Sequence, residues 1–244
     1  MSVTATDTTY YLAGCGNQNY EVKVYRKVGS HQQIGDPAWN LVLTDESFFP
    51  TTDVACDPLS ARVAISWTKA NPVNGLNDIW YAESLTGVSG SWTKVNLTNY
   101  SGPGYSAWLE TCIMFDSGGK MHIMWPAGKS TDGASFDDRA RIFHWSEWNP
   151  TKKYLVYTAE WDYNLSPCGA SQSNVFNVGK VTFGECDNKL YAVFTSWNDP
   201  ITGHLDDCQQ DDVRANGENW VCVSKNLEGI SWDAPRNLSN SYTP

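Results

Sequence analysis

The sequence predicts an all-β fold, namely a β-propeller of about four blades with four antiparallel strands in each. Three similar units, residues 57–67, 116–125 and 187–197, each begin with an aspartate and end with a tryptophan. Each unit follows a short apolar run and continues as an alternating strand, and no stretch carries the 3.6-residue apolar repeat of a helix. A strand-only repeat of roughly 60 to 70 residues is typical of sheets arranged around a common axis.

Each repeat is interpreted as four strands, A to D, counted from the axis outward. Strand A is expected at 52–56, 111–115 and 178–183, and strand B ends at Trp67, Trp125 and Trp197. Strand C is expected at 79–84, 141–145 and 220–224, and strand D at 94–98, 153–159 and 235–239. Near the N-terminus, residues 10–15, 21–27 and 41–44 fit strands B, C and D.

We therefore expect one domain over residues 1–244, with blades at about 1–44, 45–99, 100–160 and 161–240. The first blade has no evident strand A, and an open sheet edge invites aggregation. Two arrangements remain. Either residues 1–8 or the C-terminal tail complete a closed ring of four blades, or the four blades belong to a larger ring of six to eight that further blades complete.

Composition narrows the classes of partner. The formal net charge is −10 and no run of lysine or arginine occurs, which argues against a nucleic-acid partner. No apolar stretch approaches the roughly 20 residues of a membrane-spanning helix. Residues 1–4 do not look like a signal peptide. We expect a mature or excised segment located outside the cell or on its surface, with a cytoplasmic protein as the alternative.

Two turns between strands C and D carry a second pattern. Residues 84–92 are SLTGVSGSW and residues 224–232 are SKNLEGISW. They resemble the Asp-box turn, Ser-x-Asp-x-Gly-x-x-Trp, of the sialidase-like (bacterial neuraminidase repeat) propellers, with Thr86 and Asn226 in place of the aspartate. The resemblance implies the propeller fold. In that family the Asp box is a structural element and lies on the face away from the active site. The family also has an arginine at the inner end of its first strand, within an Arg-Ile-Pro sequence, which is absent here. The resemblance therefore does not imply sialidase chemistry.

The loops expected on one face of the propeller, from D to A and from B to C, contain the candidate binding residues. Exposed aromatic rings suit stacking on a sugar, and their alternative role is packing between loops or in the central channel. The candidate ligand-binding residues are Tyr105, Trp108, Trp161 and Tyr163.

A long B-to-C loop, residues 198–219, is rich in carboxylates. Oxygen ligands of this kind suit Ca²⁺, although the spacing of known calcium loops is missing and a solvated acidic loop is the alternative. The candidate metal ligands are Asp206, Asp207, Asp211 and Asp212. Cys168 and Cys208 project from two loops of the same blade, and a disulfide between them is expected to restrain both loops.

Three functions remain open on these grounds. The first is a non-catalytic binding or scaffold propeller that recognises a glycan or a protein partner on its long-loop face. The second is a glycoside hydrolase of the same fold that uses a pair of loop carboxylates. The third is a structural subunit of a larger assembly that docks through an open blade edge.

Overall fold

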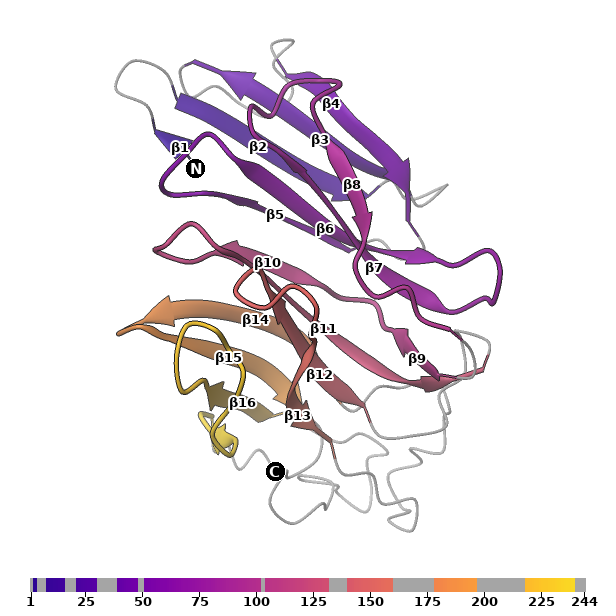
Figure 1. Cartoon of the computed structure of the whole chain (residues 1–244), viewed down its shortest axis with the longest axis vertical. Helices are drawn as coiled ribbons and strands as arrows, with labels where there is room; N and C mark the ends of the chain where they lie inside the picture. The colour runs from indigo at the N-terminus through magenta and orange to yellow at the C-terminus, as the bar shows by residue number, and fades with distance from the viewer. Residues whose placement is uncertain are drawn as a thin grey trace, which may run out of the picture.

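The computed structural model describes residues 2–3, 8–15, 21–29, 39–47, 51–101, 104–131, 140–159, 178–196 and 218–239. Within these ranges the regular elements are all β-strands, grouped into four antiparallel sheets that follow one another in chain order (Figure 1). The predicted all-β propeller is thereby confirmed. No helix in the described part of the chain is long and apolar enough to cross a membrane.

The strands of each sheet run outward from an inner strand. Sheet 1 contains β1 (Ser2–Val3), β2 (Thr8–Cys15), β3 (Glu21–Val28) and β4 (Asn40–Glu46). Sheet 2 contains β5 (Thr52–Cys56), β6 (Val63–Ala70), β7 (Asn77–Ser84) and β8 (Thr93–Asn96). Sheet 3 contains β9 (Gly104–Ala107), β10 (Cys112–Phe115), β11 (Met121–Ser130), β12 (Arg141–Ser146) and β13 (Tyr154–Thr158). Sheet 4 contains β14 (Val178–Cys186), β15 (Lys189–Ser196), β16 (Glu218–Val223) and β17 (Arg236–Asn237).

Three details differ from the strands expected from sequence. Strands β6 and β11 continue past Trp67 and Trp125, where strand B was expected to end. The extended half of β11 pairs with β9, a strand that falls in an expected loop. Strand β17 covers only two residues of the expected 235–239. The N-terminus supplies the inner strand of sheet 1 that the sequence did not make evident, because β1, which falls within residues 1–8, pairs with β2. Residues 1–8 are one of the two sources that the sequence suggested for this strand.

Three clusters of buried side chains fill the spaces between successive sheets. Val24, Ile65 and Trp67 belong to the cluster between sheets 1 and 2. Strand β11 contributes to the next two, with Ile123 in the cluster between sheets 2 and 3 and Met124 in the cluster between sheets 3 and 4. Successive residues of a strand point to opposite faces, so an almost wholly apolar strand is required where both faces are covered.

The recurring aspartates stabilise the turns between the first two strands of a repeat. The Asp116 carboxylate accepts hydrogen bonds from the Gly118 and Lys120 amides at 2.9 and 2.7 Å. The Asp57 carboxylate accepts the Leu59 amide at 2.9 Å in the same way. Aspartate side chains commonly stabilise turns by accepting nearby backbone N–H groups, which explains why the motif repeats.

The two Asp-box-like turns pack each sheet against the sheet before it. Gly87 and Gly229 have φ values of +66° and +65°, a backbone region that glycine enters without strain. A Cβ on Gly87 would lie 1.8 Å from the Tyr11 hydroxyl, and one on Gly229 would lie 2.3 Å from the His144 ring. The glycines therefore permit close contact between sheets, which supports the structural role that the resemblance implied.

Arg62 links sheets 2 and 3 by ion pairs. Its guanidinium donates to Glu83 at 2.7 Å and to Glu147 at 2.9 Å, and lies 5.0 Å from the centre of the Phe115 ring. Burial alone would raise the pKa of Glu147, but the hydrogen bonds from Arg62 and from the Met121 amide lower it below its ordinary value.

We expect Arg62→Ala to lower the free energy of unfolding by about 1 to 2 kcal/mol, because it leaves two half-buried carboxylates without their cation. Urea denaturation at pH 7 measures the loss. The loss should shrink as the pH falls through the depressed pKa of Glu147, since a protonated carboxyl no longer needs the cation. An unchanged midpoint of urea denaturation would show that the ion pairs of Arg62 contribute nothing to the stability of the contact between sheets 2 and 3.

Candidate axial site

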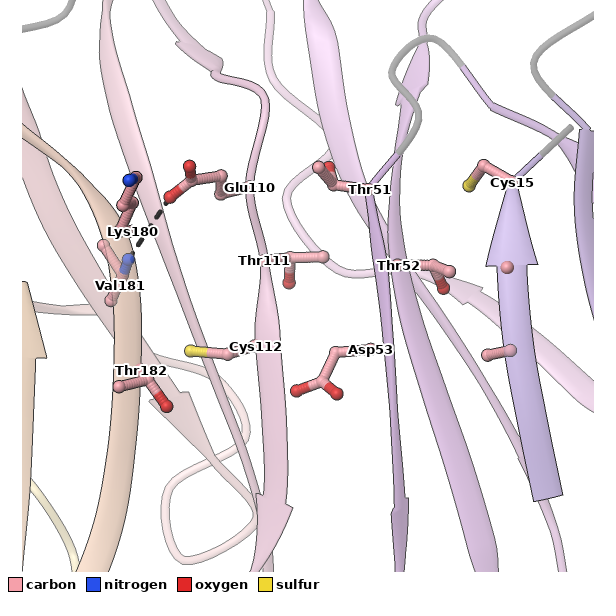
Figure 2. A pocket seen from close by; sticks show the side chains of 12 residues that line it. Cys15, Thr51, Thr52, Asp53, Glu110, Thr111, Cys112, Lys180, Val181 and Thr182 are labelled. Atoms are coloured by element: carbon pink, nitrogen blue, oxygen red, sulfur yellow. Dashed lines mark hydrogen bonds between the residues drawn. The ribbon is translucent and has the colours of Figure 1, made fainter. Parts of the chain in front are cut away.

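Strand β2 of sheet 1 and the inner strands of sheets 2, 3 and 4, together with the residues just before β5 and β10, border one cavity of about 530 Å³ (Figure 2). This volume lies in the range of small-molecule sites. The lining is mostly polar. It comprises the carboxyl groups of Asp53 and Glu110, the ammonium-bearing Lys180, four threonines (Thr51, Thr52, Thr111 and Thr182), two thiols (Cys15 and Cys112), and Ala13, Gly14 and Val181.

Asp53 lies on β5 and reaches the inner strand of the next sheet. Its two carboxylate oxygens accept the amides of Val54 and Ile113, each at 2.9 Å. Burial raises the pKa of Asp53 above its ordinary value, although these two hydrogen bonds oppose the shift. Each carboxylate oxygen can accept more than one hydrogen bond, so the group keeps acceptor capacity toward the cavity.

Glu110 precedes β10 and is held by a bulge in β14. Lys180 and Val181 lie where the pairing of β14 with β15 shifts register, and Lys180 has a φ of +51°. The Val181 amide donates to the Glu110 carboxylate at 3.2 Å, outside the strand ladder (Figure 2). Bulges and left-handed non-glycine residues are enriched at functional sites, where they re-aim backbone or side-chain groups.

The threonine hydroxyls that line the cavity differ in their hydrogen bonding. Thr52 donates to the Ser66 carbonyl at 2.9 Å, and Thr111 donates to the Ser66 hydroxyl at 3.1 Å. The Thr51 hydroxyl oxygen is buried and has no hydrogen-bond partner within the described residues. A buried hydroxyl without a hydrogen-bond partner costs free energy, so Thr51 is a destabilising feature of this part of the lining.

The arrangement suits acid–base chemistry on a neutral polar ligand. Two carboxyl groups in different environments border one cavity, and burial favours the protonated form of Asp53 by raising its pKa. Glycosidic bonds are generally hydrolysed by such a pair, one group giving a proton and the other acting on water or on the sugar.

Comparison with known proteins shows the fold. No protein-family model matches the chain, and no curated protein matches it. Solved structures do match. A thermostable family-43 glycoside hydrolase is 12% identical with a TM-score of 0.52, over 98% of this chain and 71% of that one.

Two further solved structures give similar values. An endo-arabinase from Bacteroides thetaiotaomicron is 17% identical with a TM-score of 0.53, over 96% of this chain and 77% of that one. An α-L-arabinofuranosidase from Fusarium graminearum is 11% identical with a TM-score of 0.53, over 89% of this chain and 58% of that one. The protein shares its fold with glycoside hydrolases. At these identities the likeness does not extend to residues or substrate.

The structure places two of the four predicted ligand-binding aromatics, and neither lines the cavity. Tyr105 lies on β9, where its ring packs 5.2 Å from that of Phe143 and beneath the Arg141 guanidinium at 5.3 Å. Trp108 is partly buried against the core between sheets 3 and 4. Their role as stacking surfaces for a sugar stays a prediction.

The other predicted site residues lie outside the described residues: Trp161, Tyr163, Asp206, Asp207, Asp211, Asp212, Cys168 and Cys208. The calcium site and the disulfide therefore stay predictions. The five cysteines in the described ranges are free thiols: Cys15, Cys56, Cys112, Cys186 and Cys222.

Sequence reasoning did not single out Asp53 and Glu110. A usable signal was present for Asp53, because it is a carboxylate inside an expected strand A, the strand that lines the axis. The sequence signal for Glu110 was weaker, because the position of its side chain depends on the bulge at Lys180. No sequence rule predicts a bulge at a lysine.

Proposed function

We propose that the protein hydrolyses a glycosidic bond in the axial cavity, with Asp53 and Glu110 as the carboxyl pair. The observation that carries this proposal is that carboxyl groups from two successive sheets border one cavity, at the centre of a fold shared with glycoside hydrolases.

The two groups take different roles. Asp53 is the proton donor, because burial raises its pKa and so keeps the proton available closer to neutral pH. Glu110 acts as the carboxylate that activates water or stabilises the positive charge developing on the sugar. The Val181 amide fixes its orientation and leaves its second oxygen for the ligand.

The first substrates to test are arabinose-containing glycans. Two of the matched structures are described as an endo-arabinase and an α-L-arabinofuranosidase, and these supply the first candidates. The polar lining, with hydroxyl, carboxyl and ammonium groups, suits the many hydroxyls of a neutral sugar.

The test combines turnover with binding. The protein is incubated with arabinan, arabino-oligosaccharides and a panel of other chromogenic glycosides, and released reducing ends or chromophore are measured. Calorimetry with the same compounds measures binding. Hydrolysis of at least one compound supports the proposal. Binding without turnover across the whole panel contradicts it.

One observation favours a second candidate, a binding or scaffold propeller for a glycan or protein partner. Both cavity carboxylates accept amides from the next sheet, Ile113 for Asp53 and Val181 for Glu110. Carboxylates that connect neighbouring sheets by hydrogen bonds have a structural role without taking part in catalysis. This candidate predicts binding without turnover, which the same experiment detects.

A further inference from the structure

A chain of buried polar groups joins sheet 3 to the turn of sheet 4, remote in sequence from Asp53. The Asp116 carboxylate lies 3.2 Å from His122 Nε2, and His122 Nδ1 lies 3.0 Å from His144 Nε2. His144 Nδ1 lies 3.2 Å from the Gly229 carbonyl oxygen. Asp116 and both histidines are fully buried.

Strand register explains the pairing of the two histidines. His122 lies opposite Ser146 on the neighbouring strand, and Met124 lies opposite His144, so the two imidazoles are diagonal neighbours on one face of the sheet. Their rings stack with centroids 5.2 Å apart. A nitrogen–nitrogen separation of 3.0 Å is a hydrogen-bond distance and leaves no space for a metal ion between the rings.

Counting hydrogens shows that neutral histidines cannot satisfy this chain. Three links lie between two end groups, and both the carbonyl of Gly229 and an ionised Asp116 only accept hydrogen bonds. Each link needs one hydrogen, so three are required, whereas two neutral imidazoles supply two. With both neutral, one link would set two acceptors against each other in a buried site, which is costly.

We propose that this cluster is a proton-binding site, in which His122 is an imidazolium that donates to Asp116 through Nε2 and to His144 through Nδ1. His144 is neutral and donates through Nδ1 to the Gly229 carbonyl. All three links then contain a hydrogen, and the buried positive charge lies against a buried carboxylate.

Of the two histidines, His122 has the surroundings that favour a proton more. Burial and the neighbouring His122 lower the pKa of His144 to about 3, so His144 stays neutral. Burial lowers the pKa of His122 below its ordinary value, and the carboxylates of Asp116, Glu185 and Glu147, which favour its charged form, oppose this shift. The placement of the proton therefore rests on the hydrogen count along the chain.

Asp116 is the hydrogen-bond acceptor in its contact with His122. Burial alone would raise its pKa, yet hydrogen bonds from the Lys120 amide and the Trp148 indole hold that pKa below its ordinary value. Phe183 and Trp232 of sheet 4 also make T-shaped ring contacts with His144, and the Lys120 ammonium lies over the Trp148 ring.

A bound proton makes stability depend on pH. An unfolded histidine releases its proton near pH 6.5. The proposal requires the folded pKa of His122 to lie above this value, because the hydrogen count keeps the proton in the folded cluster. The stabilisation is therefore full below about pH 6.5 and declines as the pH rises toward the folded pKa. The unfolding equilibrium constant rises about tenfold per pH unit over that window, because the native state binds one more proton than the unfolded chain.

Nitrogen-15 NMR of the histidine rings tests the proposal directly. At pH 7 we expect both ring nitrogens of His122 to be protonated, and His144 to be the Nδ1–H tautomer. A His122 ring with one unprotonated nitrogen at pH 7 would overturn the proposal.

A variant gives an independent test. In Asp116→Asn an amide N–H can face His122 Nε2 and supply the third hydrogen, so the chain no longer needs the extra proton. Because that NH₂ would also meet the Trp148 indole, the variant is combined with Trp148→Phe. We expect the double variant to lose the tenfold-per-unit dependence above about pH 6.5 that Trp148→Phe alone retains. Equal pH dependence in the two variants would contradict the proposal.

Discussion

Asp53→Asn and Glu110→Gln should each lower the rate of glycoside hydrolysis by about a thousandfold, since positioned acid–base groups generally contribute a factor of about 10² to 10⁴. An asparagine at position 53 has no acidic proton to transfer to a leaving oxygen. A glutamine at position 110 can neither activate water nor stabilise positive charge. Both substitutions are nearly isosteric, so the cavity keeps its shape. Initial rates on the best substrate of the panel measure the effect.

Two controls make the result specific. Glu46→Gln removes a carboxylate whose side chain is 85% exposed on sheet 1, and should leave the rate unchanged. The melting temperature of Asp53→Asn must also be measured. In the wild-type protein both carboxylate oxygens of Asp53 accept hydrogen bonds from backbone amides, and the NH₂ group of an asparagine would face one of these donors. A fall in rate of less than about tenfold in folded variants would remove the pair from the mechanism.

Gly229→Ala should destabilise the protein by about 3 kcal/mol or more, through a steric clash added to backbone strain. The new Cβ would lie 2.3 Å from His144 Cε1, a distance that forces the ring to move. The turn would also hold a non-glycine residue at a φ of +65°, which itself costs about 1 kcal/mol. Moving the ring breaks the contacts among His122, His144 and the Gly229 carbonyl. Chemical denaturation measures the loss.

Gly90→Ala is the matched control. Gly90 also has a positive φ, +79°, but a Cβ there meets no atom within 4 Å. It should therefore lose only the cost of the backbone conformation, about 1 kcal/mol. Similar losses in the two variants would show that the contact with His144 contributes little to the interface between sheets 3 and 4.

Much of the fold could be predicted because its signals are local. The inner strand 52–56 coincides with β5, and Asp57 and Asp116 stabilise turns where the repeat placed them. Features that depend on pairing between strands were missed. Strand β9 exists because the extended end of β11 offers it a partner, and sequence alone does not show how far β11 extends.

The candidate site was harder to predict for the same reason. Prediction favoured aromatic and acidic loops, since loops often carry function. The cavity is instead bordered mainly by strands near the axis, where Asp53 on β5 and Glu110 just before β10 line the same space only once the sheets are arranged around that axis. His122 and His144 likewise share no metal-ligand spacing, and only the register of β11 and β12 makes them neighbours.

The crystal structure of Asp53→Asn with an oligosaccharide that the wild-type protein binds tests the central claim most directly. We expect a sugar ring in the axial cavity, with a glycosidic oxygen within hydrogen-bond distance of the side chain at position 53 and Glu110 on the other side of the bond. An oligosaccharide bound only beside Tyr105 and Trp108, with the axial cavity free of sugar, would contradict the claim.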